Sequence, residues 1–206
     1  MSLGVTLRAL VVLWGILRRR LGTPKALRLT GGMLLDLLIR NPWRGMEKPK
    51  NRKETISRRV LTPLVHLYRR LRQETDSRES LALMEGIILK TTILFMRKKI
   101  PVIRPGTIKQ MSPSGRRGYL VNIARRFFNA EMENIEVSET FFKYDINRCY
   151  FARWLPRCGH PELAPFFCRG DFEYFSRIQP HIRLERTHTL AIDQQNCDFK
   201  FTLRED

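Results

Sequence analysis

Residues 137–149, which read VSETFFKYDINRC, decide the fold class of this chain. Within them the apolar side chains Phe142, Tyr144 and Ile146 alternate with polar ones, as in a strand that buries one face. Upstream, apolar residues recur mainly at helical spacing, and downstream the alternation returns twice. The sequence therefore predicts an α+β fold, with an N-terminal helical layer followed by a small antiparallel β-sheet flanked by helices.

Turn-forming and helix-breaking residues set the expected bounds of the remaining elements. Pro63 falls within a helical apolar stripe, so we expect it near the first turn of that helix or at a kink. Residues 100–118 are expected to be irregular, and the polar segment 44–53 is the best candidate for a linker. The predicted helices cover residues 3–21, 24–40, 60–71, 78–96, 119–131, 150–157 and 162–178, and the predicted strands cover residues 137–149, 183–191 and 197–203.

Charge is distributed unevenly along the 206 residues, whose net charge is +18. Residues 1–130 carry 28 Lys and Arg against 7 Asp and Glu and no cysteine, whereas residues 131–206 carry 10 against 13 and all four cysteines. A chain of this length can bury a core of its own, and its composition excludes a disordered or collagen-like protein. We expect two parts, a basic helical extension at residues 1–57 and an α+β domain at residues 58–206.

No apolar stretch is long enough to cross a membrane. The longest, residues 9–17, 31–39 and 87–96, are shorter than the roughly 20 apolar residues that a spanning helix needs. No secretory signal is recognisable either. We therefore expect a cytoplasmic protein whose cysteines are thiols or ligands rather than disulfides.

The basic N-terminal part suits several kinds of partner. Its first helix has an apolar face beside arginines, which suits the anionic inner surface of a membrane, and the alternative is a helix docked on the protein itself. An acidic protein partner is equally consistent with the charge. Nucleic acid is not expected, because no helix-turn-helix, zinc-finger or RNA-recognition motif accompanies the basic clusters. The apolar face consists of Leu3, Leu7, Leu10 and Trp14.

The C-terminal part contains the side chains that can do chemistry. Cys149 lies between a predicted strand and a predicted helix, where the helix N-terminus would lower the pKa of the thiol. Cys168 and Asp171 are three residues apart and share a face of a predicted helix. Cys197 and Asp198 are neighbours on the last strand, so only one of them can enter a given pocket.

One site that these residues could build is hydrolytic. A carboxylate or histidine would activate water, a second acid would protonate the leaving atom, and a thiol could instead attack as a covalent nucleophile. An arginine would hold a substrate carboxylate with two hydrogen bonds. The catalytic candidates are Cys168, Asp171, Cys149, Glu185 and His188, and the substrate-binding candidates are Arg148 and Arg186.

The other site would bind a metal, with zinc or iron held by thiolates and one further ligand. No Cys-x-x-Cys pair supports it, so the spacing signal is weak. Each cysteine also has a plain alternative as a buried core residue. The candidate ligands are Cys149, Cys168 and Cys197, with Asp171 or His160.

Five short pieces in order give the C-terminal part a resemblance to a known family. They are DINRC (145–149), GHPEL (159–163), FCRGD (167–171), LERT (184–187) and NCDF (196–199), preceded by a helix that reads LVHLYRRL (64–71). Together they resemble the L-2-amino-thiazoline-4-carboxylic acid hydrolase family over about residues 58–203. The basic extension finds no match in this resemblance.

The resemblance implies a hydrolase with a small-molecule substrate and no certain cofactor. It would open a five-membered ring that contains a C=N bond, giving an S-carbamoyl-cysteine-type product. The layout of the cysteines is also similar to that of 4-vinyl-reductase-type ligand-binding domains. That second likeness implies an α+β ligand pocket. The alternative functions are a non-enzymatic ligand- or metal-sensing module that uses the C-terminal cysteines, and a basic peripheral-membrane protein.

Overall fold

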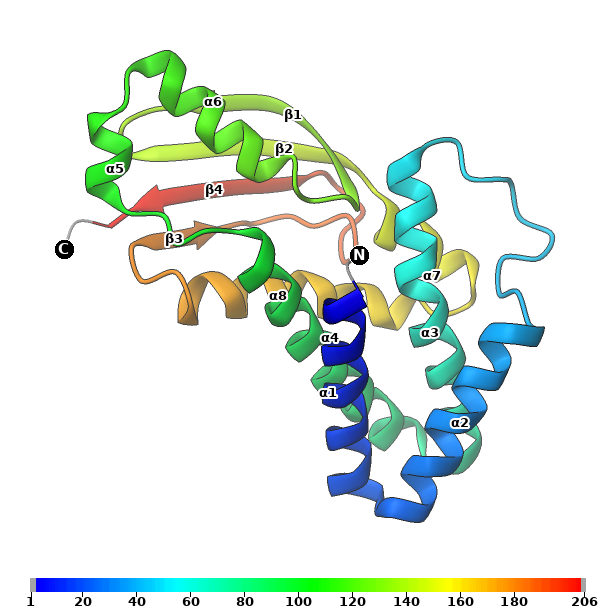
Figure 1. Ribbon diagram of the computed structural model, residues 1–206. Helices are drawn as coiled ribbons and strands as arrows, with labels where there is room; N and C mark the ends of the chain where they lie inside the picture. Colours follow the sequence, from blue (N-terminus) through cyan, green and yellow to red (C-terminus); the bar gives the residue numbers. More distant parts are fainter. Residues whose placement is uncertain (1–2, 205–206) are drawn as a thin grey trace.

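The computed structural model describes residues 3–204 and consists of helices around one four-stranded sheet (Figure 1). The α+β class is confirmed. The helical part comprises α1 (Leu3–Leu21), α2 (Thr23–Ile39), α3 (Arg52–Glu74) and α4 (Ser77–Lys99), followed by the short α5 (Pro105–Gln110) and α6 (Pro113–Ala124). The remainder comprises β1 (Ala130–Val137), β2 (Phe141–Cys149), α7 (Tyr150–Arg157), the 3-10 helix η1 (Pro161–Leu163), α8 (Ala164–Arg177), β3 (Ile182–Glu185) and β4 (Cys197–Leu203).

Side-chain caps fix where the long helices begin. The Asn51 side chain accepts a hydrogen bond from the Glu54 N–H at the start of α3, and Asp76 accepts one from the Glu79 N–H at the start of α4. Pro63, expected near a first turn or at a kink, lies in the interior of α3. A proline there costs about 3 kcal/mol, and the long buried face of this helix, which includes Leu61 and five other apolar residues, outweighs that cost.

The sheet is antiparallel throughout, in the order β1-β2-β4-β3. As the alternation predicts, Phe142, Tyr144 and Ile146 are buried on one face. In β4 the buried partners that lie opposite Tyr144 and Ile146 are Phe199 and Cys197. One face of the sheet therefore packs on helices, α8 among them, while the other carries polar residues (Figure 1).

Three sequence predictions of secondary structure are wrong. Residues 119–131 were expected to be one helix, but α6 ends at Ala124 and β1 begins at Ala130. β1 is an edge strand with two register shifts and a positive φ at Asn134, so its alternation is broken and gives no clear period. The irregular stretch 100–118 contains α5 and begins α6.

The third error is the strand expected at residues 183–191, of which only Arg183 to Glu185 belong to β3. Beyond Glu185 the Asp198 carboxylate accepts the backbone N–H groups of Thr187 and His188, at 3.0 and 2.6 Å. A side chain thus replaces the backbone carbonyl that would have continued the ladder, and the chain leaves the sheet.

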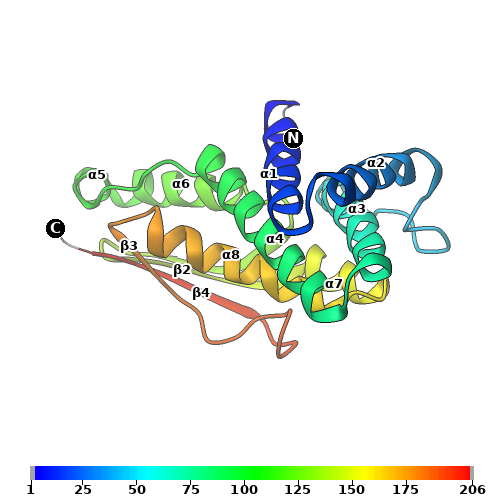
Figure 2. The same cartoon turned by 90° about the horizontal axis from the view of Figure 1, so that it is seen from below.

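The basic extension packs on the rest of the protein. α1 and α2 form a V that lies against α4 and α3, on the side away from α7 and β4 (Figure 2). Leu17 of α1 and Leu29 and Met33 of α2 are completely buried in the same core as α3 and α4. The expected boundary at residue 57 falls inside α3. Within residues 3–204 no helix combines the length and the apolar character that crossing a bilayer requires.

Candidate functional site

A cavity of about 490 Å³ lies where the helical part meets the end of the sheet. α1 to α4 supply one wall, and β2, α7, α8, β4 and the loop after β3 supply the other. Cys149, at the junction of β2 and α7, packs against both the helical core and the sheet core. This volume is within the range of about 300–1,000 Å³ that is usual for small-molecule sites.

The polar groups of the cavity are concentrated at the sheet wall, around Asp171 and Arg186. Arg186 Nη1 lies 3.3 Å from Asp171 Oδ2, and its Nη2 donates to the Cys168 carbonyl oxygen at 2.9 Å. The guanidinium also stacks on the rings of Phe172 and Phe199 and is only 2% exposed. Its buried Nε has no hydrogen-bond partner among the described residues.

Burial raises the pKa of Asp171 from 3.8 to about 6, although Arg186 opposes the shift through charge and a hydrogen bond. Asp171 is the one carboxylate among the described residues that line this cavity. A group with this pKa is charged at neutral pH and still basic enough to take a proton from water. The predicted sharing of a helix face by Cys168 and Asp171 is confirmed, because both line the cavity from α8.

Three of the four thiols, those of Cys149, Cys168 and Cys197, line the same cavity. Burial raises the pKa of each of them, that of Cys197 to about 11. The expected lowering at Cys149 is therefore wrong. The N–H groups of Phe151 and Ala152 at the start of α7 do lower the pKa of this thiol, but burial outweighs them. At neutral pH these three side chains are thiols rather than thiolates.

Several predicted site residues lie elsewhere. Glu185 forms ion pairs with Arg183 and Lys200 on the solvent side of the sheet, and His188 pairs with Asp193 in the loop after β3. Arg148 pairs with Glu131 across β1 and β2 and is 56% exposed. None of these three predicted residues lines the cavity. Glu185 and His188 lie outside the cavity because β3 ends at Glu185, and Arg148 lies outside it because its position in β2 faces solvent.

The predicted metal site is not found. Among the described residues no group of three or more His, Cys, Asp and Glu side chains is placed to hold a metal ion. His160, a predicted ligand, instead accepts a hydrogen bond from Arg69 Nε at 3.2 Å and packs edge-on against Tyr68. Cys158, the fourth thiol, is buried apart from the cavity, and burial raises its pKa.

Sequence reasoning missed other polar residues that line the cavity. The Tyr144 hydroxyl comes from β2, Asn129 from the loop before β1, and Arg59 from α3. Tyr144 had a signal, since its burial in the strand was expected, but nothing in the alternation says where its hydroxyl points. Arg59 is exposed and forms no ion pair within the described residues. It gave no signal, because it is one of many arginines on helices.

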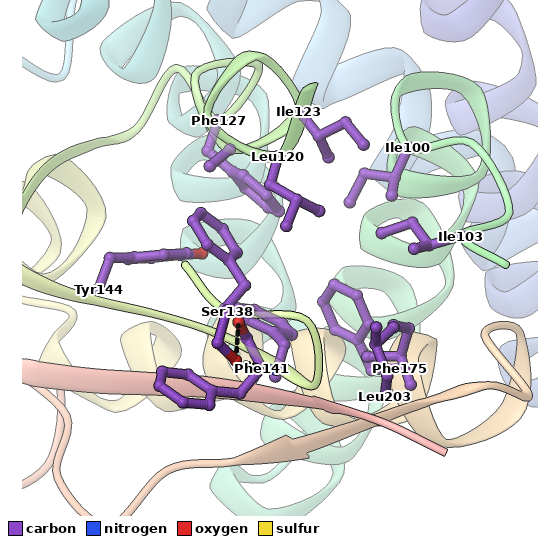
Figure 3. Close-up of a pocket in the computed structure, with 14 residues that line it drawn as sticks. Ile100, Ile103, Leu120, Ile123, Phe127, Ser138, Phe141, Tyr144, Phe175 and Leu203 are labelled. Atoms are coloured by element: carbon purple, nitrogen blue, oxygen red, sulfur yellow. Dashed lines mark hydrogen bonds between the residues drawn. The ribbon is translucent and has the colours of Figure 1, made fainter. Parts of the chain in front are cut away.

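A second, smaller cavity of about 40 Å³ lies between α6, the strands and α8 (Figure 3). It is lined by apolar side chains such as Leu120, Phe142 and Phe175. Ser138 is its polar neighbour, and the Ser138 hydroxyl accepts the Phe141 N–H at 2.9 Å. The space is too small and too apolar for a substrate, so it is a packing void in the sheet core.

Comparison with known proteins identifies the family. Residues 53–201 match the model of the L-2-amino-thiazoline-4-carboxylic acid hydrolase family. Neither a curated protein nor a solved structure matches the chain. The chain belongs to this family, and the resemblance seen in its sequence is confirmed. The matched residues include Asp171, Arg186 and all three cavity thiols but leave out α1 and α2.

Proposed function

We propose that this family member hydrolyses a C=N-containing heterocycle or a related amidine by attack of water. The observation that carries the proposal is the pair of Asp171 and Arg186 at the polar end of the large cavity. The family membership supports a hydrolase at the coarse level. A cavity with a single carboxylate of raised pKa supports the finer mechanism.

In the proposed mechanism Asp171 acts first as base and then as acid. It takes a proton from water while the water oxygen bonds to the carbon of the C=N group. It returns that proton to the nitrogen of the C=N group, which receives the π electrons as the tetrahedral intermediate forms. When the intermediate collapses to a carbonyl, Asp171 takes the proton of the new hydroxyl and passes it to the ring nitrogen or sulfur whose bond to carbon breaks. One carboxyl with a pKa of about 6 can serve in both steps, which removes the need for Glu185 or His188.

Arg186 is assigned the role of holding the substrate. Nη1 and Nη2 each donate one hydrogen bond, to Asp171 and to the Cys168 carbonyl, and the Nε–H has no partner and is the donor proposed for an acceptor on the ligand. The same guanidinium stabilises the charged form of Asp171. The raised pKa values of Cys149 and Cys168 argue against a covalent thiol nucleophile, because the thiolate is the reactive form.

The test measures the ring opening of 2-amino-thiazoline-4-carboxylate and the hydrolysis of simple amidines, with a set of matched variants. Asp171→Asn should lower kcat by at least about 100-fold. Cys168→Ser and Cys149→Ser should retain activity within a few-fold if water is the nucleophile. Glu185→Gln and His188→Ala are the controls and should leave kcat unchanged. Full activity of the Asp171→Asn variant would overturn this mechanism. Loss of activity in Cys168→Ser or in Cys149→Ser would overturn it as well.

A ligand-binding module without turnover is the second candidate function. The buried, protonated thiols and the mostly apolar lining favour it. The same experiment separates the two functions. Saturable binding of a ring compound with no product, in a folded protein whose Asp171→Asn variant binds equally well, would favour the binding module.

A further inference from the structure

The cavity is larger and more apolar than a small ring acid requires. A ring acid with about nine non-hydrogen atoms, at roughly 20 Å³ each, fills little more than a third of the cavity at protein-like packing. The remaining space of the 490 Å³ is lined by apolar side chains of the four long helices. They include Leu10, Leu13, Met33, Val60 and Ile87.

The two ends of the cavity differ in exposure as well as in polarity. Asp171, Arg186 and the three thiols form the polar end, and the Arg186 side chain is nearly inaccessible. The exposed lining residues all lie on α1, α2 and α3, so the cavity opens to solvent on that side. They are Thr6, Leu34, Leu37 and Arg59. A ligand that reaches Asp171 from this mouth leaves its trailing part among aliphatic side chains.

We propose that the cavity binds an amphiphile, whose amidine-like head lies at Asp171 and Arg186 and whose apolar tail extends toward the mouth between α1 and α2. The nature of the head rests on the proposed function, whereas the tail rests on the size and lining of the cavity alone. α1 and α2 lie outside the family match, so this part of the chain shapes a tail site that the matched residues do not provide.

The experiment measures the binding of n-alkylamidines of two to twelve carbons by calorimetry, in the full chain carrying Asp171→Asn so that the amidines are not hydrolysed. Each buried methylene should tighten binding about fourfold, from about 0.8 kcal/mol per group, until the tail reaches the mouth. Ala9→Trp places a bulky ring in the lining and should abolish the gain for long chains. Val11→Trp is the matched control, two residues along α1 on an exposed position outside the cavity, and should leave the series unchanged.

A flat dependence on chain length, or an equal gain in Ala9→Trp, would overturn the tail site. Circular dichroism and a thermal melt establish that both tryptophan variants are folded. Because binding is measured without turnover, a chain-length effect together with absent ring opening would overturn the proposed reaction and leave the tail site standing. Hydrolysis of the ring acid or of short amidines by the unmodified chain, without a chain-length effect on binding, would overturn the tail site and leave the proposed reaction standing.

A different observation carries a second proposal. Of the eleven exposed large hydrophobic residues in the described chain, eight lie on α1 and α2. Leu38 is 84% exposed and Val11 is 70% exposed. Exposed apolar residues usually occur singly on the surface of a protein, so eight on two neighbouring helices indicate an interaction site. We call these eight residues the apolar face: Leu7, Val11, Leu27, Leu34, Leu35, Leu37, Leu38 and Ile39.

The charges on α1 and α2 indicate what kind of surface the apolar face would bind. α1 and α2 carry one acidic residue, Asp36, which is buried between Arg40 and Arg70 and adds no exposed negative charge. Four exposed basic residues, Arg18, Arg19, Arg20 and Lys25, lie at the turn between the two helices, and the exposed Arg8 and Arg40 are the chain neighbours of Leu7 and Ile39 at the other ends of the two helices. Exposed leucines beside exposed cations suit an anionic bilayer, which offers both acyl chains and phosphates. We infer that the apolar face docks on an anionic lipid surface.

Co-sedimentation of the full chain with vesicles tests this inference. Binding to vesicles with 30% phosphatidylglycerol should be at least tenfold tighter than to pure phosphatidylcholine, and 0.5 M NaCl should weaken it. Leu38→Glu should reduce binding by tenfold or more. Ile192→Glu is the matched control, because Ile192 is also 70% exposed but lies in the loop before β4. Equal binding of both variants, or a dimer in light scattering that Leu38→Glu dissolves, would overturn the proposal.

Discussion

The two walls of the large cavity differ in almost every property. The sheet wall, built by β2, α7, α8, β4 and the loop after β3, carries the carboxylate, the buried guanidinium and the three thiols. The helical wall, built largely by α1 and α2 with α3 and α4, carries aliphatic side chains and the mouth. The family match covers the whole first wall and only part of the second. The comparison teaches that the reactive groups and the apolar end of the cavity are set largely by different parts of the chain.

The sharpest test of the sheet wall is to remove its buried cation. Arg186→Met leaves Asp171 without its ion-pair partner and should lower the free energy of unfolding at pH 7 by about 3–5 kcal/mol. Urea denaturation measures it. The double variant Arg186→Met with Asp171→Asn should recover part of the loss. An effect below 1 kcal/mol would mean that the pair is not buried as described.

The helical wall is tested by two leucines of the same two helices. Leu17 is fully buried in the helical core, so Leu17→Ala should cost about 2–5 kcal/mol of unfolding free energy. Leu38→Ala, on the exposed apolar face, should change it by less than about 0.5 kcal/mol. Equal small effects in denaturation curves would show that α1 is not part of the core.

The pH dependence of stability isolates the electrostatics of the sheet wall. The folded-state pKa of Asp171 is raised from 3.8 to about 6, so between these pH values the folded protein keeps a proton that the unfolded chain releases. Stability contributed by this proton is present at pH 4 and is lost as the pH rises through about 6, by about 3 kcal/mol. Asp171→Asn should lack this fall. Denaturation midpoints of both proteins at pH 4 and pH 7 give the difference, and parallel curves would contradict it.

The smallest expected effect concerns the contact between the two walls. A Cβ at Gly170 of α8 would lie 2.7 Å from Thr92 Cγ2 and 2.9 Å from Thr92 Cβ on α4. Gly170→Ala should therefore cost about 1–3 kcal/mol through overpacking. Gly86→Ala, in the interior of α4 with no atom within 4 Å, is the matched control and should stabilise by about 0.5–1 kcal/mol. Thermal melts of the two variants should shift in opposite directions.

Local pattern was a sound guide wherever one face of an element is buried by regular neighbours. The alternation in β2 predicted its buried face, and the spacing of Cys168 and Asp171 placed both on one side of α8. Pattern failed at β1, where register shifts and the positive φ of Asn134 interrupt the alternation. It also failed after Glu185, because the carboxylate that ends β3 comes from a residue on the neighbouring strand.

The sequence by itself determined the α+β class and the family, and it named the five side chains at the polar end of the cavity, namely Cys149, Cys168, Asp171, Arg186 and Cys197. Only the tertiary structure decided that Glu185, His188 and Arg148 face away from the cavity, and that α1 and α2 complete its wall. It also reversed the expected pKa of Cys149. The physical reason is the same in each case. Periodicity reports which side of an element is buried, whereas burial by distant segments decides what that side faces and how strongly its charges are desolvated.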